Sequence, residues 1–170
     1  MSKYSFNNAL SLLVENEFGA LTRVTSLIRR RGYNITSLVV AETIDPSISR
    51  ITLMLQCEEG RLPQIVEQLR KSVNVIRVEV YSEEAYMSRE LLMIRVKAKG
   101  NRYAIAKIAD NFHARLIEAT DRSITLELSD TPAKTHAFVE KLEPFGVIDL
   151  ARTGIVALER CPPDSPQNEA

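Results

Sequence analysis

A short stretch near the N-terminus, Asn16-Glu17-Phe18-Gly19-Ala20-Leu21, has the residue types to bind a small charged ligand. The first N–H groups of a helix are unpaired and lie at the positive end of its dipole, where a carboxylate binds readily. Gly19, at the expected helix entry, would let a ligand approach those groups closely. The Asn16 amide oxygen could accept hydrogen bonds from an ammonium group. These features suit a free amino acid, although spacing alone favours a tight turn capped by Asn16.

A second candidate lies about fifteen residues later, in the segment Arg31-Gly32-Tyr33-Asn34-Ile35. Asn34 and Ile35 could present one polar and one apolar group to a small branched ligand. The alternative is a helix that ends at Gly32 and is followed by an edge strand, and spacing alone favours that alternative.

The residues that catalysis or metal binding would need are not grouped in this sequence. His113 and His136 are the two histidines, and neither belongs to an HxxxH or HxxE pattern. The six glycines form no GxSxG, P-loop or GxGxxG motif. Cys57 falls in the apolar phase of a strand, which is typical of a core thiol. We therefore expect no catalytic residue, no metal site and no cofactor in this chain.

The apolar periodicity of the first half predicts a βαββαβ order of elements. Gly32 is a natural end for the first helix, and Asp45-Pro46-Ser47 is a turn signal between two strands. The expected strands are 10–14, 34–43, 50–57 and 76–80, and the helical stripes are 20–28 and 62–69.

The same order of elements repeats about eighty residues later. Thr131 is the expected N-cap of the last helix, with Pro132 at its first position. The sequence identity between the halves is slight, so only the pattern repeats. This order predicts two α+β domains, each a sheet covered by helices on one face. The expected strands are 91–98, 115–119, 123–128 and 147–158, the last of them broken near Gly154.

We place the domain boundary at the charged stretch Ser82-Glu83-Glu84, which gives domains of residues 1–82 and 83–160. The polar, proline-rich segment 161–170 is expected to be disordered. On the third strand, Thr52 and Met54 should face away from the helices. Such a half-apolar face needs a cover, and we expect a second copy of the chain to supply it in a homodimer.

Charge and composition argue against several classes of partner. The chain has 22 basic and 22 acidic residues, and each half is neutral, so nucleic acid and membrane surfaces are poor partners. RNA-binding domains of this topology stack bases on aromatic residues of the central strands, and strands 10–14 and 51–56 contain none. Without a signal-peptide pattern, an apolar run that could span a membrane or a CxxC pair, the chain is expected in the cytoplasm.

Several segments resemble, in order and spacing, the family of small regulatory subunits of acetohydroxyacid synthase (acetolactate synthase). The similarity covers about residues 8–160. The segments that carry it are 13–24 (LVENEFGALTRV), 31–38 (RGYNITSL), 43–52 (TIDPSISRIT), 89–94 (RELLMI) and 151–154 (ARTG).

The resemblance implies two tandem ferredoxin-like domains, of which the first is an ACT domain that pairs across a homodimer. It implies an effector, valine or another branched-chain amino acid, between paired ACT domains. It also implies a separate catalytic subunit that carries thiamine diphosphate, magnesium and FAD. The effector contacts would come from Asn16, Gly19, Ala20 and Leu21 of one chain and from Asn34 and Ile35 of the other.

Two functions remain in competition. The first is a non-catalytic regulatory subunit that activates the synthase and mediates feedback inhibition by a branched-chain amino acid, with valine the leading choice. The alternative is a stand-alone ACT-type amino-acid sensor or a regulator of another protein. A regulator of transcription usually adds a helix-turn-helix, and no segment of this sequence is left over to form one.

Overall fold

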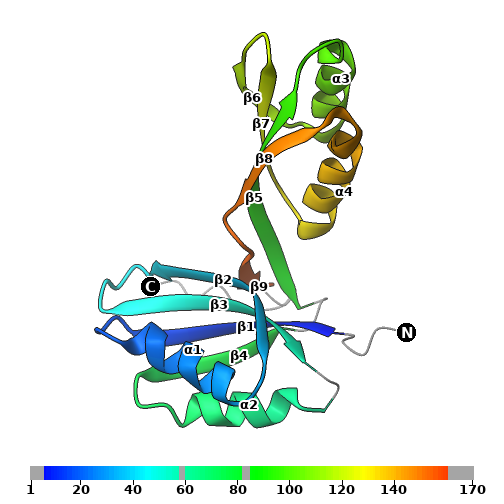
Figure 1. The fold of residues 1–170 in the computed structure, drawn as a ribbon. Coiled ribbons are helices and arrows are strands. Elements are labelled where there is room, and N and C mark those ends of the chain that lie inside the picture. The colour runs from blue at the N-terminus through cyan, green and yellow to red at the C-terminus, as the bar shows by residue number, and fades with distance from the viewer. Residues whose placement is uncertain (1–5, 58–59, 82–84, 161–170) are drawn as a thin grey trace. The chain divides into compact units, whose positions relative to one another are not determined.

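The computed structural model describes residues 6–57, 60–81 and 85–160, which form two compact units (Figure 1). The first unit comprises the chain up to Met87 together with the chain from Ala157 onward. The second unit is Ser88–Val156.

The predicted boundary at residues 82–84 and the predicted disordered tail, 161–170, lie outside the described residues. A unit defined by its contacts is not the same as a family domain. The predicted bounds of 1–82 and 83–160 therefore stay a prediction.

The first unit has the predicted βαββαβ order. Its four strands form one antiparallel sheet in the order β2-β3-β1-β4, with two edge strands, β2 and β4. The α+β class predicted from the sequence is thereby confirmed for this unit. Its elements are β1 (Phe6–Glu15), α1 (Ala20–Arg30), β2 (Asn34–Glu42), β3 (Ile48–Cys57), α2 (Leu62–Arg70) and β4 (Val75–Tyr81).

Helices α1 and α2 lie side by side on one face of this sheet (Figure 1). The apolar side chains of α1 recur every three or four residues, so they form one stripe that faces the sheet. Each fully buried aliphatic side chain contributes about 1.5–3 kcal/mol, and this packing fixes where both ends of α1 lie. The buried residues are Leu10, Leu12, Val14, Ala20, Val24, Ile28, Ile51, Leu53, Leu55, Ile65, Val66, Leu69 and Val78.

The opposite face of the sheet is partly buried within the chain itself. Thr52 is 3% exposed and Met54 is 5% exposed, although both lie on the face that carries no helix. Tyr81 on the same face is stacked on Tyr86, with 5.5 Å between ring centroids. Thr52 and Met54, which the sequence predicts to be open, are therefore buried within the chain, and the predicted homodimer stays a prediction.

The second unit repeats the antiparallel arrangement, with strand order β6-β7-β5-β8 and helices α3 and α4 over one face (Figure 1). Phe138 is fully buried in its core, 5.2 Å from the Phe112 ring centroid. Thr131 and Pro132 occupy the predicted N-cap and first helical positions, but the Thr131 hydroxyl makes no capping bond. The elements are β5 (Tyr86–Lys97), α3 (Arg102–Phe112), β6 (Arg115–Ala119), β7 (Ser123–Asp130), α4 (Pro132–Leu142), a 3-10 turn η1 (Glu143–Phe145) and β8 (Val147–Arg152).

A further strand, β9 (Val156–Glu159), follows β8 and pairs with β5. The predicted strand 147–158 is thus two strands, separated around Gly154 as expected. Gly154 has φ +91°, a left-handed conformation that glycine adopts without steric cost.

Candidate functional site

The loop between β1 and α1 has the backbone that the sequence predicts for an anion site. Gly19 is the N-cap residue of α1, with φ +85°. An L residue is strained at this angle, so glycine is required where the chain enters the helix. The loop is closed by backbone bonds from Ala20 N to Glu17 O (3.2 Å) and from Arg23 N to Gly19 O (3.0 Å).

Two N–H groups at this helix end are available to a ligand. Within the described ranges, the backbone N–H groups of Leu21 and Thr22 have no hydrogen-bond acceptor. No atom lies within 4 Å of the position that a Cβ on Gly19 would occupy, so the approach to this end of α1 is open. The arrangement can therefore bind a carboxylate through unpaired N–H groups and the positive end of the helix dipole.

The side chains of two predicted site residues, Ala20 and Leu21, differ in how far a ligand could reach them. The Ala20 side chain is 4% exposed and belongs to the core, and its N–H is taken by Glu17. The Leu21 side chain is 39% exposed and can contact a ligand or a second chain. Phe18, beside Gly19, is fully exposed, so this loop presents a large apolar surface.

Asn16 ties the loop to the turn that joins β2 and β3. Its amide nitrogen donates to Glu42 Oε1 at 3.1 Å and to Pro46 O at 2.9 Å. Its amide oxygen accepts a bond from the Ser49 hydroxyl at 3.0 Å. Since an amide oxygen has two lone pairs, one remains for a ligand ammonium group.

Glu42 lies beside the candidate site, and the sequence analysis missed it. Its carboxylate reaches Asn16 from the end of β2, across 26 residues of sequence, and places a negative charge where a ligand ammonium group would favour one. The turn at Asp45-Pro46-Ser47 was the available signal, since it brings the end of β2 close to the start of β3.

The second predicted group lies at the far end of α1. Asn34 is exposed at the first position of β2, and Ile35 is half-buried against the core. Helix α1 has 11 residues, which corresponds to about 16 Å at 1.5 Å per residue. A single chain therefore does not bring Asn34 and Ile35 together with Asn16 and Gly19.

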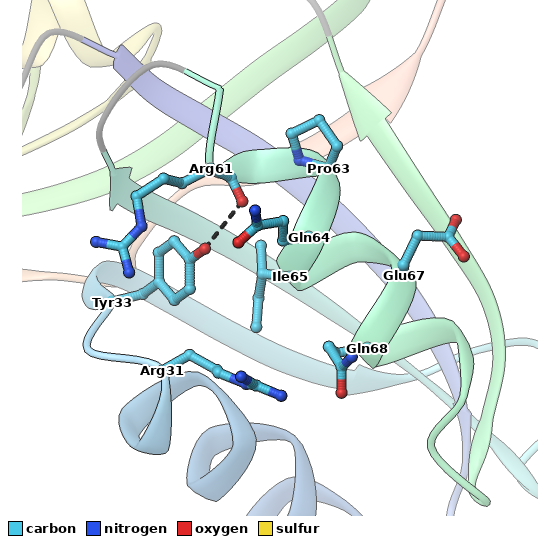
Figure 2. A pocket seen from close by; sticks show the side chains of 8 residues that line it. All are labelled: Arg31, Tyr33, Arg61, Pro63, Gln64, Ile65, Glu67 and Gln68. Carbon is cyan, nitrogen blue, oxygen red and sulfur yellow. Dashed lines mark hydrogen bonds between the residues drawn. The ribbon is translucent and has the colours of Figure 1, made fainter.

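A separate hollow of about 470 Å³ lies between the end of α1 and the start of α2 (Figure 2). The Tyr33 hydroxyl donates to the Arg61 carbonyl at 2.9 Å, and the Arg61 guanidinium lies 5.3 Å from the Tyr33 ring centroid. None of the six predicted site residues lines this hollow, so it is distinct from the predicted site. Its lining residues are Arg31, Tyr33, Arg61, Pro63, Gln64, Ile65, Glu67 and Gln68.

Two other kinds of feature are missing from the part of the chain that the structure describes. It contains no cluster of three or more His, Cys, Asp or Glu side chains that could hold a metal ion. It also contains no helix long and apolar enough to cross a membrane.

Comparison with known proteins accounts for both halves of the chain. Residues 10–77 match the family model described as "AHAS small subunit-like ACT domain", and this range includes all six predicted site residues. Residues 89–161 match the model described as "Small subunit of acetolactate synthase".

Full-length relatives are similar along almost the whole chain. The acetolactate synthase small subunit of Mycolicibacterium smegmatis is 39% identical over 163 residues, covering 95% of this chain and 96% of that protein. The acetolactate synthase isozyme 3 small subunit of Escherichia coli is 39% identical over 153 residues, covering 89% and 94%. The crystal structure of the small subunit from Thermotoga maritima superposes with a TM-score of 0.85 at 30% identity, covering 92% of this chain and 99% of that one. Sequence and fold agree along both units, and the chain therefore belongs to the acetolactate synthase small subunit family.

Proposed function

We propose that this chain is the non-catalytic regulatory subunit of an acetolactate synthase, and that it binds a branched-chain amino acid, with valine as the leading choice. Membership of the small subunit family supports the first part of the proposal. The free N–H groups at the start of α1 support the second part, because an amino acid carries the carboxylate that they can bind.

The observation that carries the proposal is the hydrogen bond between Asn16 and Glu42. It places the N-terminal end of α1 beside the end of strand β2, while Asn34 begins the same strand. Strand β2 is an edge strand, and among the described residues only β3 pairs with it. Leu38 and Val40 on this edge strand are 36% and 40% exposed.

A two-fold axis would pair two β2 strands in opposite directions. The start of β2 in one copy would then lie opposite the end of β2 in the other. Asn34 and Ile35 of one chain would therefore approach Glu42 and Asn16 of its partner. In such a homodimer each site is built from both chains, so the two groups no longer need to meet across the length of α1, about 16 Å, within one chain.

Within that shared site each residue type has a role. The N–H groups of Leu21 and Thr22 bind the effector carboxylate, while the Asn16 amide oxygen and the Glu42 carboxylate accept hydrogen bonds from its ammonium group. Asn34 and Ile35 of the other chain contact the rest of the ligand, the isoleucine packing against the branched side chain. Because the effector binds only the dimer, it must also stabilise the dimer, by about 2.7 kcal/mol for each of the two sites at a hundred times its dissociation constant.

The catalytic chemistry belongs to a separate large subunit in this proposal. Thiamine diphosphate, magnesium and FAD are carried by that subunit, and this chain contributes no cofactor ligand. The isolated chain is expected to form no acetolactate from pyruvate, but to raise the turnover of the catalytic subunit from the same host. Turnover by the chain alone, with thiamine diphosphate supplied, would refute the non-catalytic assignment.

The shared site is tested by mixing two disabled chains, one carrying Gly19→Asp and the other Asn34→Ala. Neither homodimer should bind valine well in calorimetry, because each has the same defect at both sites. In a mixed dimer one site carries both substitutions and the other carries neither. Random mixing makes half of the dimers mixed, so the mixture should bind about one quarter of the wild-type amount.

The mixed dimers must be shown to form, for example by native mass spectrometry of differently tagged chains. If they form and bind no more ligand than either parent, the site is not shared between chains. Leucine and isoleucine are measured in parallel, so that loss of valine binding is not mistaken for a change of preference.

A further inference from the structure

A wide basic groove runs along the outer side of helix α1, toward the loop between α2 and β4. We call it the α1 groove. It has a volume of about 690 Å³, and four cations line it together with hydroxyl and apolar side chains. Its lining residues are Thr22, Arg23, Ser26, Leu27, Arg29, Arg30, Lys71, Ser72 and Val73.

The described residues do not balance the charge in this groove. No carboxylate lines it, and none of Arg23, Arg29, Arg30 and Lys71 makes an ion pair with another described residue. The whole chain has zero formal charge, so the concentration of four cations here is local. Like charges in a concave site repel one another, and a negatively charged partner would relieve this repulsion.

Helix stability explains only part of the cluster. Arg29 and Arg30 lie in the last turn of α1, where the helix dipole favours cations. Arg23 is the fourth residue of the helix, near its positive end, where the dipole gives a cation no support. Arg23 and Arg30 are seven residues apart, two helical turns, so they lie on one stripe of α1.

The lining of the groove fits a protein segment better than nucleic acid. It contains no aromatic side chain on which a base could stack. It does contain Leu27 and Val73, and the latter is 89% exposed, so apolar contacts are available beside the charges. A carboxylate-rich protein segment with an apolar residue would complement both properties.

We propose that the α1 groove is a docking surface for an acidic segment of the catalytic subunit. This rests on the proposed function, which supplies the catalytic subunit as the partner. The groove uses the outer side of α1 and the α2–β4 loop, so it leaves the free edge of β2 to the second copy of the chain. The regulatory dimer can therefore form while both of its α1 grooves remain open.

The test compares two full-length variants with the same change of charge. The groove variant carries Arg23→Glu and Arg30→Gln. The control carries Lys107→Glu and Lys141→Gln in the second unit, where Lys141 lies in the last turn of its helix as Arg30 does. Thermal unfolding followed by circular dichroism checks that both variants fold.

The affinity of each chain for the catalytic subunit of the same host is measured between about 50 and 300 mM NaCl. The wild-type affinity should fall as the salt concentration rises. The groove variant should bind at least about tenfold more weakly at low salt and lose most of that salt dependence, while the control stays within about twofold of wild type. Carbodiimide coupling should also join the Lys71 amine to a carboxylate of the catalytic subunit.

Each outcome decides a different claim. If the wild-type chain does not associate with the catalytic subunit, the proposed function fails and the docking surface fails with it. If the wild type associates but the groove variant binds as tightly as the control, the function stands and this inference is overturned. Loss of RNA or inorganic phosphate binding in the groove variant, with unchanged affinity for the catalytic subunit, also overturns it.

Discussion

Two substitutions of Gly19 distinguish the effect of backbone strain on stability from the effect of an added charge on ligand binding. The residue has φ +85°, and no atom lies within 4 Å of an added Cβ, so a side chain there meets strain but no clash. An L residue in the left-handed region costs about 1–2 kcal/mol. The loss of glycine freedom in the unfolded chain offsets about 0.4–1 kcal/mol of this cost. The net destabilisation of Gly19→Ala should therefore be about 1 kcal/mol.

Gly19→Asp should add an electrostatic effect on ligand binding. The new carboxylate would lie beside the N–H groups of Leu21 and Thr22 and accept their hydrogen bonds in place of the effector. It would also repel the effector carboxylate, by about 1 kcal/mol at 4 Å in water and about 4 kcal/mol near a protein surface. We predict at least about a tenfold loss of valine affinity for Gly19→Asp, and a much smaller loss for Gly19→Ala.

Gly100 provides the matched control in the second unit. Its φ is +78°, and its missing Cβ also has no neighbour within 4 Å. Gly100→Asp should lower the melting temperature by about 4–8 °C. Gly19→Asp should lower it by less, because the backbone cost is similar but the new carboxylate also accepts hydrogen bonds from the first N–H groups of α1. Isothermal calorimetry should then show a loss of valine affinity in the Gly19→Asp variant and none in the Gly100→Asp variant. Equal valine affinity in the two variants would refute the assignment of the effector carboxylate to the start of α1.

Two further predictions concern groups outside the helix end. Glu90 is 5% exposed and pairs with Arg152 at 3.2 Å. Arg152→Met should leave this charge buried without its partner and lower the free energy of unfolding in urea by at least about 2 kcal/mol. The control Arg115→Met removes an exposed pair and should lower it by less than about 1 kcal/mol. Hydrogen bonds from the Ser47 hydroxyl and N–H hold the pKa of Asp45 below its ordinary value of 3.8. These bonds stabilise the folded chain above pH 3.8, and this stabilisation is lost as the pH falls through the pKa of the folded state. Ser47→Ala should raise this pKa toward 3.8 in a carboxyl NMR titration, and an unchanged value would contradict the role of the hydroxyl.

Local patterns were sufficient to predict the elements of both units. The alternation of apolar residues located the strands. Gly19 marked the start of α1, because the left-handed conformation at this helix entry favours glycine. Strand β6 has the predicted bounds, Arg115–Ala119, since a helix end and a short turn delimit it. These features depend on residues that are close in sequence.

Contacts between distant segments could not be predicted in this way. Tyr86 stacks on Tyr81, on the sheet face that also carries Thr52 and Met54, and nothing in the local sequence of β3 indicates this contact. Glu42 reaches Asn16 only because the β2–β3 turn folds back toward the first loop. In the candidate site, the glycine at the helix entry could therefore be predicted from the sequence, whereas the position of Glu42 beside Asn16 required the three-dimensional structure.

The attachment of Asn16 also has a kinetic consequence. Four hydrogen bonds immobilise the loop before any ligand arrives: the Asn16 side chain donates two and accepts one, and its N–H donates to Ser47 O at 2.7 Å. A pre-organised loop loses little conformational entropy on binding, and no slow ordering step precedes ligand capture. We therefore expect the amino acid to bind without a slow conformational step, so that the site fills as soon as the amino-acid concentration rises, while the slower protein–protein contacts stay in place.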